Sequence, residues 1–146
     1  MKNNKGFSLV ELIIVIAIMA VLVGVLAPTY LQYVEKSKKA NDVSTIDTIV
    51  NAVEIAAIDP VVVGAANTDE TITITVTSGG MAITPNTGKW VETINDAVSD
   101  AKLKSFDSVS FTATKSKDTG KVVFSYVDAN TDDDFEDYAT SLSKIS

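Results

Sequence analysis

An uncharged apolar run near the N-terminus, from Leu12 to Pro28, constrains the fold of this chain more than any other feature. From Phe7 to Ala27 the sequence is nearly continuous leucine, isoleucine, valine, alanine and methionine. An α-helix rises about 1.5 Å per residue, so roughly 20 such residues cross a hydrocarbon core of about 30 Å. The run therefore predicts a membrane-spanning helix, and its residues do not count toward the core of a soluble domain.

Two simpler interpretations of this run are a cleaved secretory signal and a plain signal anchor. A secretory signal has an apolar region of only about 7–15 residues, and its cleavage site follows that region. Here the run is longer, and the small residue Gly6 precedes it. A plain signal anchor remains open, but it does not explain Glu11, because a carboxylate at the edge of hydrocarbon is costly and marks a functional site by default.

The residues that lead into the run are Gly6-Phe7-Ser8-Leu9-Val10-Glu11. They resemble the prepilin processing site of type IV pilins and type II secretion pseudopilins. The resemblance implies that residues 1–6 are a leader, which a prepilin peptidase removes after Gly6 before it methylates the new amine of Phe7. It also implies that Glu11 pairs with the terminal amine of a neighbouring subunit during assembly. The alternative is a carboxylate that reaches back to the lipid headgroups.

Lysines flank both ends of the apolar run. Lys2 and Lys5 precede it, and three more follow, namely Lys36, Lys38 and Lys39. Counting these charges does not place the N-terminus inside the cell. The resemblance implies the opposite, with a cytoplasmic leader, a single-pass membrane precursor and a final location in an extracellular cell-surface pilus.

Pro28 lies where the helix should continue. Its ring clashes with the carbonyl of Gly24 and removes one backbone hydrogen bond, and glycine is itself a weak helix former. The pair predicts a kink or a segment that unwinds locally. The resemblance implies that this region melts in assembled fibres, and a passive kink is the alternative.

After the predicted membrane helix, 7–28, helical periodicity continues over residues 29–58. One apolar stripe comprises Val43, Ile46, Val50, Val53 and Ala57. Polar residues are expected to occupy the other face, namely Asp42, Thr45, Asp47, Thr48, Asn51 and Glu54. The helix is expected to end near Ile58, because Asp59-Pro60 disfavours further αR geometry.

Strand patterns dominate the remaining segment, 59–146, which is the predicted extracellular head domain. Thr71 to Thr77 alternates strictly, and residues 81–84 are expected to pair back on it after the Gly79-Gly80 turn. A second pair of strands is predicted at 109–113 and 121–127. Between these pairs lies a short helix, expected to run from Trp90 to Ala101 and to be closed by Lys102 and Lys104. The fold class is α+β, a long N-terminal helix packed on a small antiparallel sheet, which resembles the pilin fold.

Composition narrows the chemistry. The chain has no cysteine and no histidine, and all 12 basic residues are lysine. Zinc sites and His-based acid–base catalysis therefore lose their usual groups, and no nucleophile–base pair is visible, so the prediction is a protein that is not an enzyme. A net charge of −7 disfavours nucleic-acid binding by the head. The missing disulfide differs from many pilins of Gram-negative bacteria and suggests a Gram-positive relative.

One acidic segment near the C-terminus is a candidate calcium site. Its oxygen-bearing residues are Asp128, Asn130, Asp132 and Asp134. Major pseudopilins are known as a family for calcium in this region. An EF-hand loop, however, requires glycine where Asp133 stands and a glutamate where Ala139 stands. A solvated acidic turn is the alternative, and no other cofactor is expected.

These features together predict a structural subunit of a type IV pilus, similar to a major pilin. The partners that the resemblance implies are further copies in a helical filament, the prepilin peptidase, an assembly ATPase and a platform membrane protein. The alternative is a pseudopilin or minor tip pilin of a type II secretion or DNA-uptake system, acting as a binding module. A membrane-tethered surface domain that never polymerises is the third option.

Overall fold

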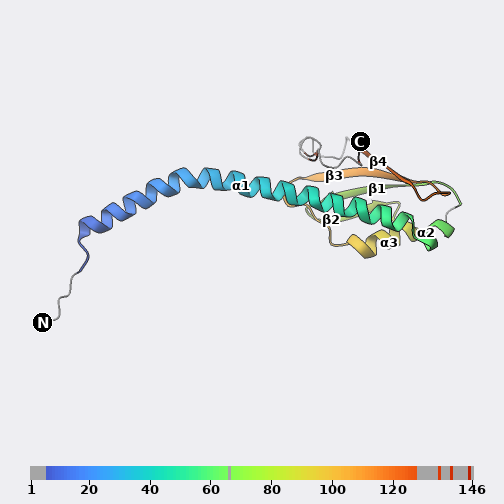
Figure 1. Ribbon diagram of the computed structural model, residues 1–146, viewed down its shortest axis with the longest axis horizontal. Helices are drawn as coiled ribbons and strands as arrows, with labels where there is room; N and C mark the ends of the chain where they lie inside the picture. Colours follow the sequence, from blue (N-terminus) through green and yellow to red (C-terminus); the bar gives the residue numbers. More distant parts are fainter. Residues whose placement is uncertain (1–5, 66, 128–134, 136–138, 140–144, 146) are drawn as a thin grey trace. The chain divides into compact units, whose positions relative to one another are not determined.

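The computed structural model describes residues 6–65, 67–127, 135, 139 and 145. The chain divides into two compact units, Met1–Ser37 and Lys38–Ser146. Helix α1, Leu9–Ala57, has its first part in the N-terminal unit and its second part in the other (Figure 1). The single long helix confirms the sequence-based expectation of about fifty helical residues.

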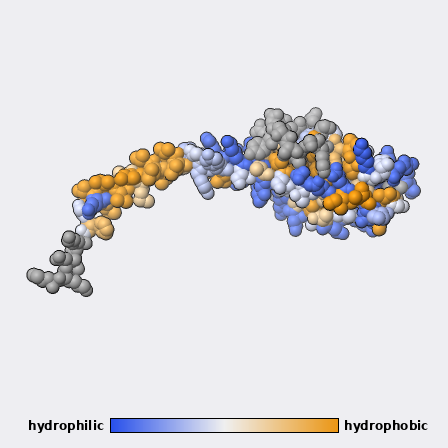
Figure 2. Space-filling view, in the orientation of Figure 1, coloured by the Kyte–Doolittle hydropathy of each residue, from blue (hydrophilic) through white to orange (hydrophobic). Residues whose placement is uncertain are grey.

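In the N-terminal unit, α1 carries its apolar side chains on the outside (Figure 2). Leu12, Met19 and Leu26, for example, are all more than half exposed. By length and composition this helix can cross a membrane, and none of its most apolar window is buried. A helix that is apolar all round requires a partner such as lipid or other helices, because water cannot solvate it favourably.

In the C-terminal unit, the second part of α1 buries the stripe that periodicity predicts. Ile46, Val50, Val53 and Ala57 are fully buried, and Val43 packs against the same core. The helix ends at Ala57, next to the expected residue.

A short helix that the sequence patterns did not predict follows at once: α2, Pro60–Ala65. Asp59 caps it, since its Oδ1 accepts the backbone N–H of Val61 at 2.7 Å, and proline suits the first helical position. The Asp-Pro pair that ends α1 therefore also starts α2.

Four strands form one antiparallel sheet in the order β2-β1-β3-β4. Their bounds are β1 Glu70–Thr77, β2 Gly80–Thr84, β3 Ser108–Lys115 and β4 Val122–Tyr126. The two predicted pairs are β1 with β2 and β3 with β4, and β1 with β3 joins them in the middle. The predicted strands are thus confirmed within a few residues at each end.

The strict alternation in β1 and β3 separates the two faces of the sheet. Ile72, Ile74 and Val76 are buried on the face that α1 covers. Hydroxyl residues occupy the other face and pair across strands, as Thr71 with Thr114 at 3.0 Å and Thr75 with Ser110 at 2.9 Å between hydroxyl oxygens. Such cross-strand pairs each add about 0.2–1 kcal/mol to sheet stability.

Helix α3, Lys89–Val98, lies beside α1 in Figure 1. Its Trp90 is buried, and the indole Nε1–H donates to the carbonyl of Val53 in α1 at 3.1 Å. The predicted closure by Lys102 and Lys104 is wrong, because both lie beyond the helix end. The backbone N–H of Leu103, which is itself buried, donates to the carbonyl oxygen of Thr77 at the end of β1, so the segment that carries both lysines follows the sheet and does not continue the helix.

Asp42 contradicts the expected polar face of α1. Its side chain is fully buried, and its two carboxylate oxygens accept three backbone N–H groups of the loop after α3. The donors are Lys104 at 2.7 Å, Ser105 at 2.7 Å and Phe106 at 3.1 Å. A carboxylate tolerates this burial because its acceptor capacity is met by fixed donors. Asp42 therefore ties α1 to the loop that leads into β3.

Candidate assembly site at the N-terminus

The candidate site is the first turn of α1, where Ser8 and Glu11 form a reciprocal capping pair. Glu11 Oε2 accepts the backbone N–H of Ser8 at 2.8 Å. Ser8 Oγ in turn accepts the backbone N–H of Val10 at 3.3 Å. This arrangement is a variant of the capping box, in which a serine before the helix and a glutamate three residues later satisfy orphan backbone donors; here the serine oxygen accepts the N–H of Val10 in place of that of Glu11. The pattern Ser-x-x-Glu could have revealed it from the sequence, and our sequence analysis missed it.

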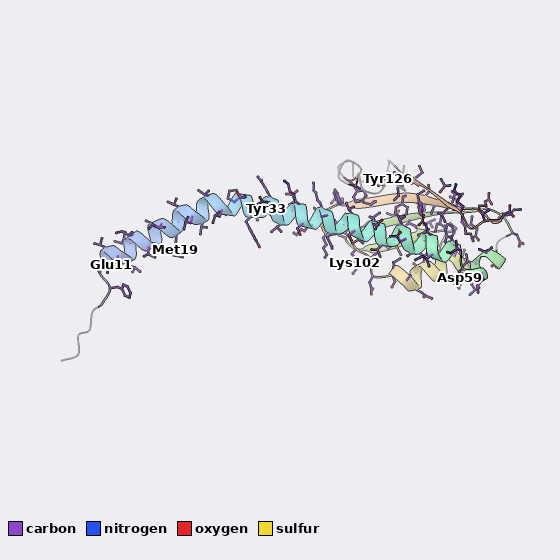
Figure 3. All side chains as sticks on the ribbon, viewed as in Figure 1. Glu11, Met19, Tyr33, Asp59, Lys102 and Tyr126 are labelled. Atoms are coloured by element: carbon purple, nitrogen blue, oxygen red, sulfur yellow. The ribbon has the colours of Figure 1, made fainter. Side chains whose placement is uncertain are left out.

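The capping pair gives Glu11 a role inside a single copy of the chain. A carboxylate in the first helical turn also interacts favourably with the helix dipole. A carboxylate offers about four lone-pair positions, and the hydrogen bond from Ser8 occupies one. Glu11 is exposed at the start of α1 (Figure 3), so its remaining acceptor positions are accessible. Glu11 can therefore cap α1 and still accept a cation from outside.

The predicted processing site lies just before this turn. Gly6 is exposed, and a Cβ added there would meet nothing within 4 Å. Phe7 is 96% exposed. The Gly6–Phe7 bond is therefore sterically open to a protease. The backbone N–H that Glu11 caps belongs to Ser8, so cleavage before Phe7 would leave the capping hydrogen bond in place.

The predicted weak point of the membrane helix is an unbroken part of α1. Gly24 and Pro28 both have helical backbone, and a Cβ at Gly24 would meet nothing within 4 Å. Proline still removes one hydrogen bond from the helix at this point. Local melting on assembly therefore stays a prediction.

The candidate calcium ligands lie outside the described residues, since Asp128, Asn130, Asp132 and Asp134 all fall between the described residues 127 and 135. Among the residues that the structure does describe, no group of three or more Asp, Glu, His or Cys side chains could hold a metal ion. Calcium binding by the C-terminal segment remains a prediction.

A buried lysine in the head was also missed by the sequence analysis. Lys115 ends β3 on the core face, and its Nζ forms an ion pair with Glu70 Oε2 at 2.8 Å. The same Nζ lies 5.2 Å from the centroid of the Trp90 ring and 3.5 Å from the carbonyl oxygen of Val62. The Lys115 side chain is 1% exposed, whereas that of Glu70 is 39% exposed. This cluster stabilises the head by tying β1, β3, α2 and α3 together.

The fold and the N-terminal site define a class: an α+β head preceded by an apolar helix with a prepilin-type N-terminus. Comparison with known proteins supports this class. Residues 1–27 match the prokaryotic N-terminal methylation motif. These residues include every position of the proposed processing site, and over this part of the chain the sequence is similar to the fimbrial and pilus proteins described next.

Three relatives illustrate the similarity. Fimbrial protein Q of Moraxella bovis is 39% identical over 83 residues, which cover 54% of this chain and 53% of the relative. A fimbrial protein of Pseudomonas aeruginosa is 36% identical over 59 residues, covering 40% of this chain and 38% of the relative. The type IV wide pilus major component PilA4 of Thermus thermophilus is 55% identical over 42 residues, which cover 29% of this chain and 30% of the relative.

The chain spans about half the length of the first relative and less of the others. No solved structure matches the chain. The expectation of a Gram-positive source finds no support in these relatives.

Proposed function

We propose that this chain is the major structural subunit of a type IV pilus and that it acts without catalysis. The single observation that carries the proposal is a carboxylate, Glu11, at the start of an exposed apolar helix and one turn after the predicted new N-terminus at Phe7. The relatives named as fimbrial and pilus proteins support it. In this proposal the precursor is held in the membrane by α1, and the acidic head later faces outward from a filament.

The proposed chemistry begins when a prepilin peptidase cleaves after Gly6. Phe7 then carries a free amine, which is largely cationic near neutral pH, and N-methylation leaves it able to carry a proton. A carboxylate in a medium of low dielectric constant requires a hydrogen-bonded cation. The Phe7 ammonium of a neighbouring copy supplies that cation and guides each incoming subunit. An assembly ATPase and a platform membrane protein are the proposed partners that drive extraction from the bilayer.

The energetics of assembly follow from the exposed first part of α1. Lipid tails are as apolar as leucine, so moving this helix from bilayer to filament core gains little hydrophobic free energy. Direction and register must then come from polar contacts. The Glu11–Phe7 pair is proposed to supply them, which explains why a charge is retained beside an otherwise uncharged run.

Processing is tested by intact-mass measurement of the Gly6→Leu variant. Wild-type protein is expected to lack residues 1–6 and to carry one added methyl group, whereas Gly6→Leu is expected to keep the precursor mass. Gly64→Leu is the matched control, because a Cβ at Gly64 also meets nothing within 4 Å and Gly64 lies far along the chain from the motif. Normal processing of Gly6→Leu would refute the cleavage assignment.

Assembly is tested by three variants that separate charge from helix capping. Glu11→Gln keeps a capping-box acceptor but loses the charge, Glu11→Val loses both, and Ser8→Ala weakens the cap but keeps the charge. We expect electron microscopy of sheared surface material to show few filaments for both Glu11 variants and near-normal numbers for Ser8→Ala. Normal filament yield from Glu11→Gln would show that the charge is dispensable. Processed protein without surface filaments in the wild type would favour the pseudopilin alternative.

A further inference from the structure

We propose that Glu35 and Lys39 form a second ion pair between neighbouring subunits, with Lys39 of one copy against Glu35 of the next. The inference rests on the proposed function, since it concerns the filament that the Glu11–Phe7 pair builds. It assigns an interaction surface that begins at the end of the apolar part of α1 and fits a second copy of this chain.

The axial offset between neighbouring copies is set by the first pair. Glu11 follows Phe7 by four residues, and four residues of α-helix rise about 6 Å. A copy whose Glu11 meets the Phe7 ammonium of its neighbour is therefore displaced along the helix axis by about four residues, within the reach of the side chain. Each residue n of one copy then lies level with residue n−4 of the other.

The same offset holds at every level of a regular filament. Identical copies are related by one rotation and one translation, so the axial displacement at residue 11 is also the displacement at residue 39. Any kink or melting between Gly24 and Pro28 occurs in both copies alike and leaves this displacement unchanged. The charges beyond the apolar run can therefore be compared directly at an offset of four.

At that offset the charges of α1 beyond the membrane segment are complementary. The charged residues between positions 29 and 57 are Glu35, Lys36, Lys38, Lys39, Asp42, Asp47 and Glu54. Lys39 of one copy comes level with Glu35 of the other, and no two like charges in this set come level. Asp42 comes level with Lys38, but its carboxylate is committed to the backbone of its own head. Glu35 and Lys39 are therefore the pair that the register selects.

Each of the two residues already makes contacts within its own chain. Glu35 is exposed and Lys39 is half-buried, with its Nζ 5.4 Å from the centroid of the Phe106 ring. A pair at i and i+4 on one solvated helix is worth only about 0.3–0.5 kcal/mol. Between packed helices water is partly excluded, and the same charges attract more strongly. The proposed pair between chains is therefore stronger than the same two charges would be on one solvated helix.

Charge reversal in the whole chain tests this pairing. Glu35→Lys places lysine at both positions, and Lys39→Glu places glutamate at both, so each variant alone sets like charges against each other between copies. We expect about a tenfold loss of sheared filaments for each single variant. The double variant Glu35→Lys/Lys39→Glu restores the yield, and so does co-expression of the two single variants, in which copies alternate.

Co-expression distinguishes the two possible pairs. In each single variant like charges stand four residues apart on one helix, so a role confined to one helix predicts rescue by the double variant but none by co-expression. That result would overturn the inference. Filaments that contain both single variants, identified by mass spectrometry, would support it.

Three controls complete the test. Asp47→Lys reverses a charge on the same helix that meets no charge at this offset, and its yield should equal that of the wild type. Trp90 fluorescence melting must show that each head is folded, since Lys39 contacts Phe106. Normal wild-type filaments with unaffected single variants would overturn the Glu35–Lys39 pair alone, whereas a wild type without filaments would overturn the proposed function with it.

Discussion

Replacement of Asp42 by asparagine should destabilise the head far more than replacement of any solvated carboxylate on α1. Asparagine is nearly isosteric, but it keeps only one oxygen and turns an NH2 group toward backbone N–H donors. Oδ2 of Asp42 accepts from both Ser105 and Phe106, so the asparagine oxygen is expected to take that position and to keep both bonds without the charge. The NH2 group then faces the N–H of Lys104, which loses its acceptor.

The magnitude follows from these three bonds. Hydrogen bonds to a charged group contribute about 1.5–3 kcal/mol each, and a buried donor left without an acceptor costs about 1–3 kcal/mol. Because two bonds lose their charge and the bond to Lys104 is lost, we expect a net destabilisation of about 3 kcal/mol. For a unit of the size of Lys38–Ser146 this lowers the melting temperature by about 12 °C.

The assay is thermal unfolding of the chain in detergent, followed by tryptophan fluorescence. Trp90 is the only tryptophan and is buried against α1, so its emission reports unfolding of the head. Asp47→Asn is the matched control, because Asp47 is exposed on the same helix and accepts only a 3.3 Å hydrogen bond from Asn51. The control should melt within about 2 °C of the wild type. An Asp42→Asn protein that melts equally close to the wild type would refute the anchoring role.

Three further predictions use the same fluorescence signal. Gly120→Ala should destabilise the head by at least about 2 kcal/mol, because Gly120 has φ +67° and a Cβ there would lie 2.8 Å from the last carbonyl oxygen of α1. Gly64→Ala, where a Cβ meets open space, is the control and should be neutral or stabilising. Equal denaturation midpoints for the two variants would contradict this prediction. Glu70→Ala should lower the free energy of unfolding by about 2 kcal/mol, since it leaves the buried ammonium of Lys115 without its carboxylate. Lys115→Met should lower it less, because the more exposed Glu70 remains hydrated. A larger loss for Lys115→Met than for Glu70→Ala would be inconsistent with the burial of the pair. Calcium should raise the melting temperature of the head if residues 128–134 bind it. The same melting temperature with calcium and with a chelator would refute the predicted calcium site.

Local patterns in the sequence were sufficient for most of the fold. The alternation from Thr71 to Thr77 predicted β1 and its buried face, because a strand with one solvated face must alternate. The apolar spacing beyond the membrane run predicted which side of α1 is buried, and Asp59-Pro60 predicted its end. Each of these signals depends on residues that are close together in the chain.

The errors arose where distant residues decide the outcome. Asp42 looks like any polar residue on a helix, and its partners lie 62 to 64 residues away in the chain. No local pattern indicates that contact. Lys115 was different. It lies an even number of residues after Val109, Phe111 and Ala113 in β3, so its side chain had to lie on the same, buried face of the sheet. Strand parity could have identified it as a buried charge that requires a partner.

The capping box changes how the charge at Glu11 should be understood. The cost of placing a carboxylate near hydrocarbon is lowered before any neighbour arrives, because the Ser8 N–H and the helix dipole already stabilise it. The capping hydrogen bond is made within a single copy, so it is present before any assembly. In the proposed filament the neighbour's ammonium would then supply only the remaining stabilisation, which would make the contact between copies reversible. On this basis the Ser-x-x-Glu pattern and the proposed pairing are two parts of one hypothesis: the cap lowers the cost of the charge in the single copy, and the proposed ion pair would use that charge in the filament.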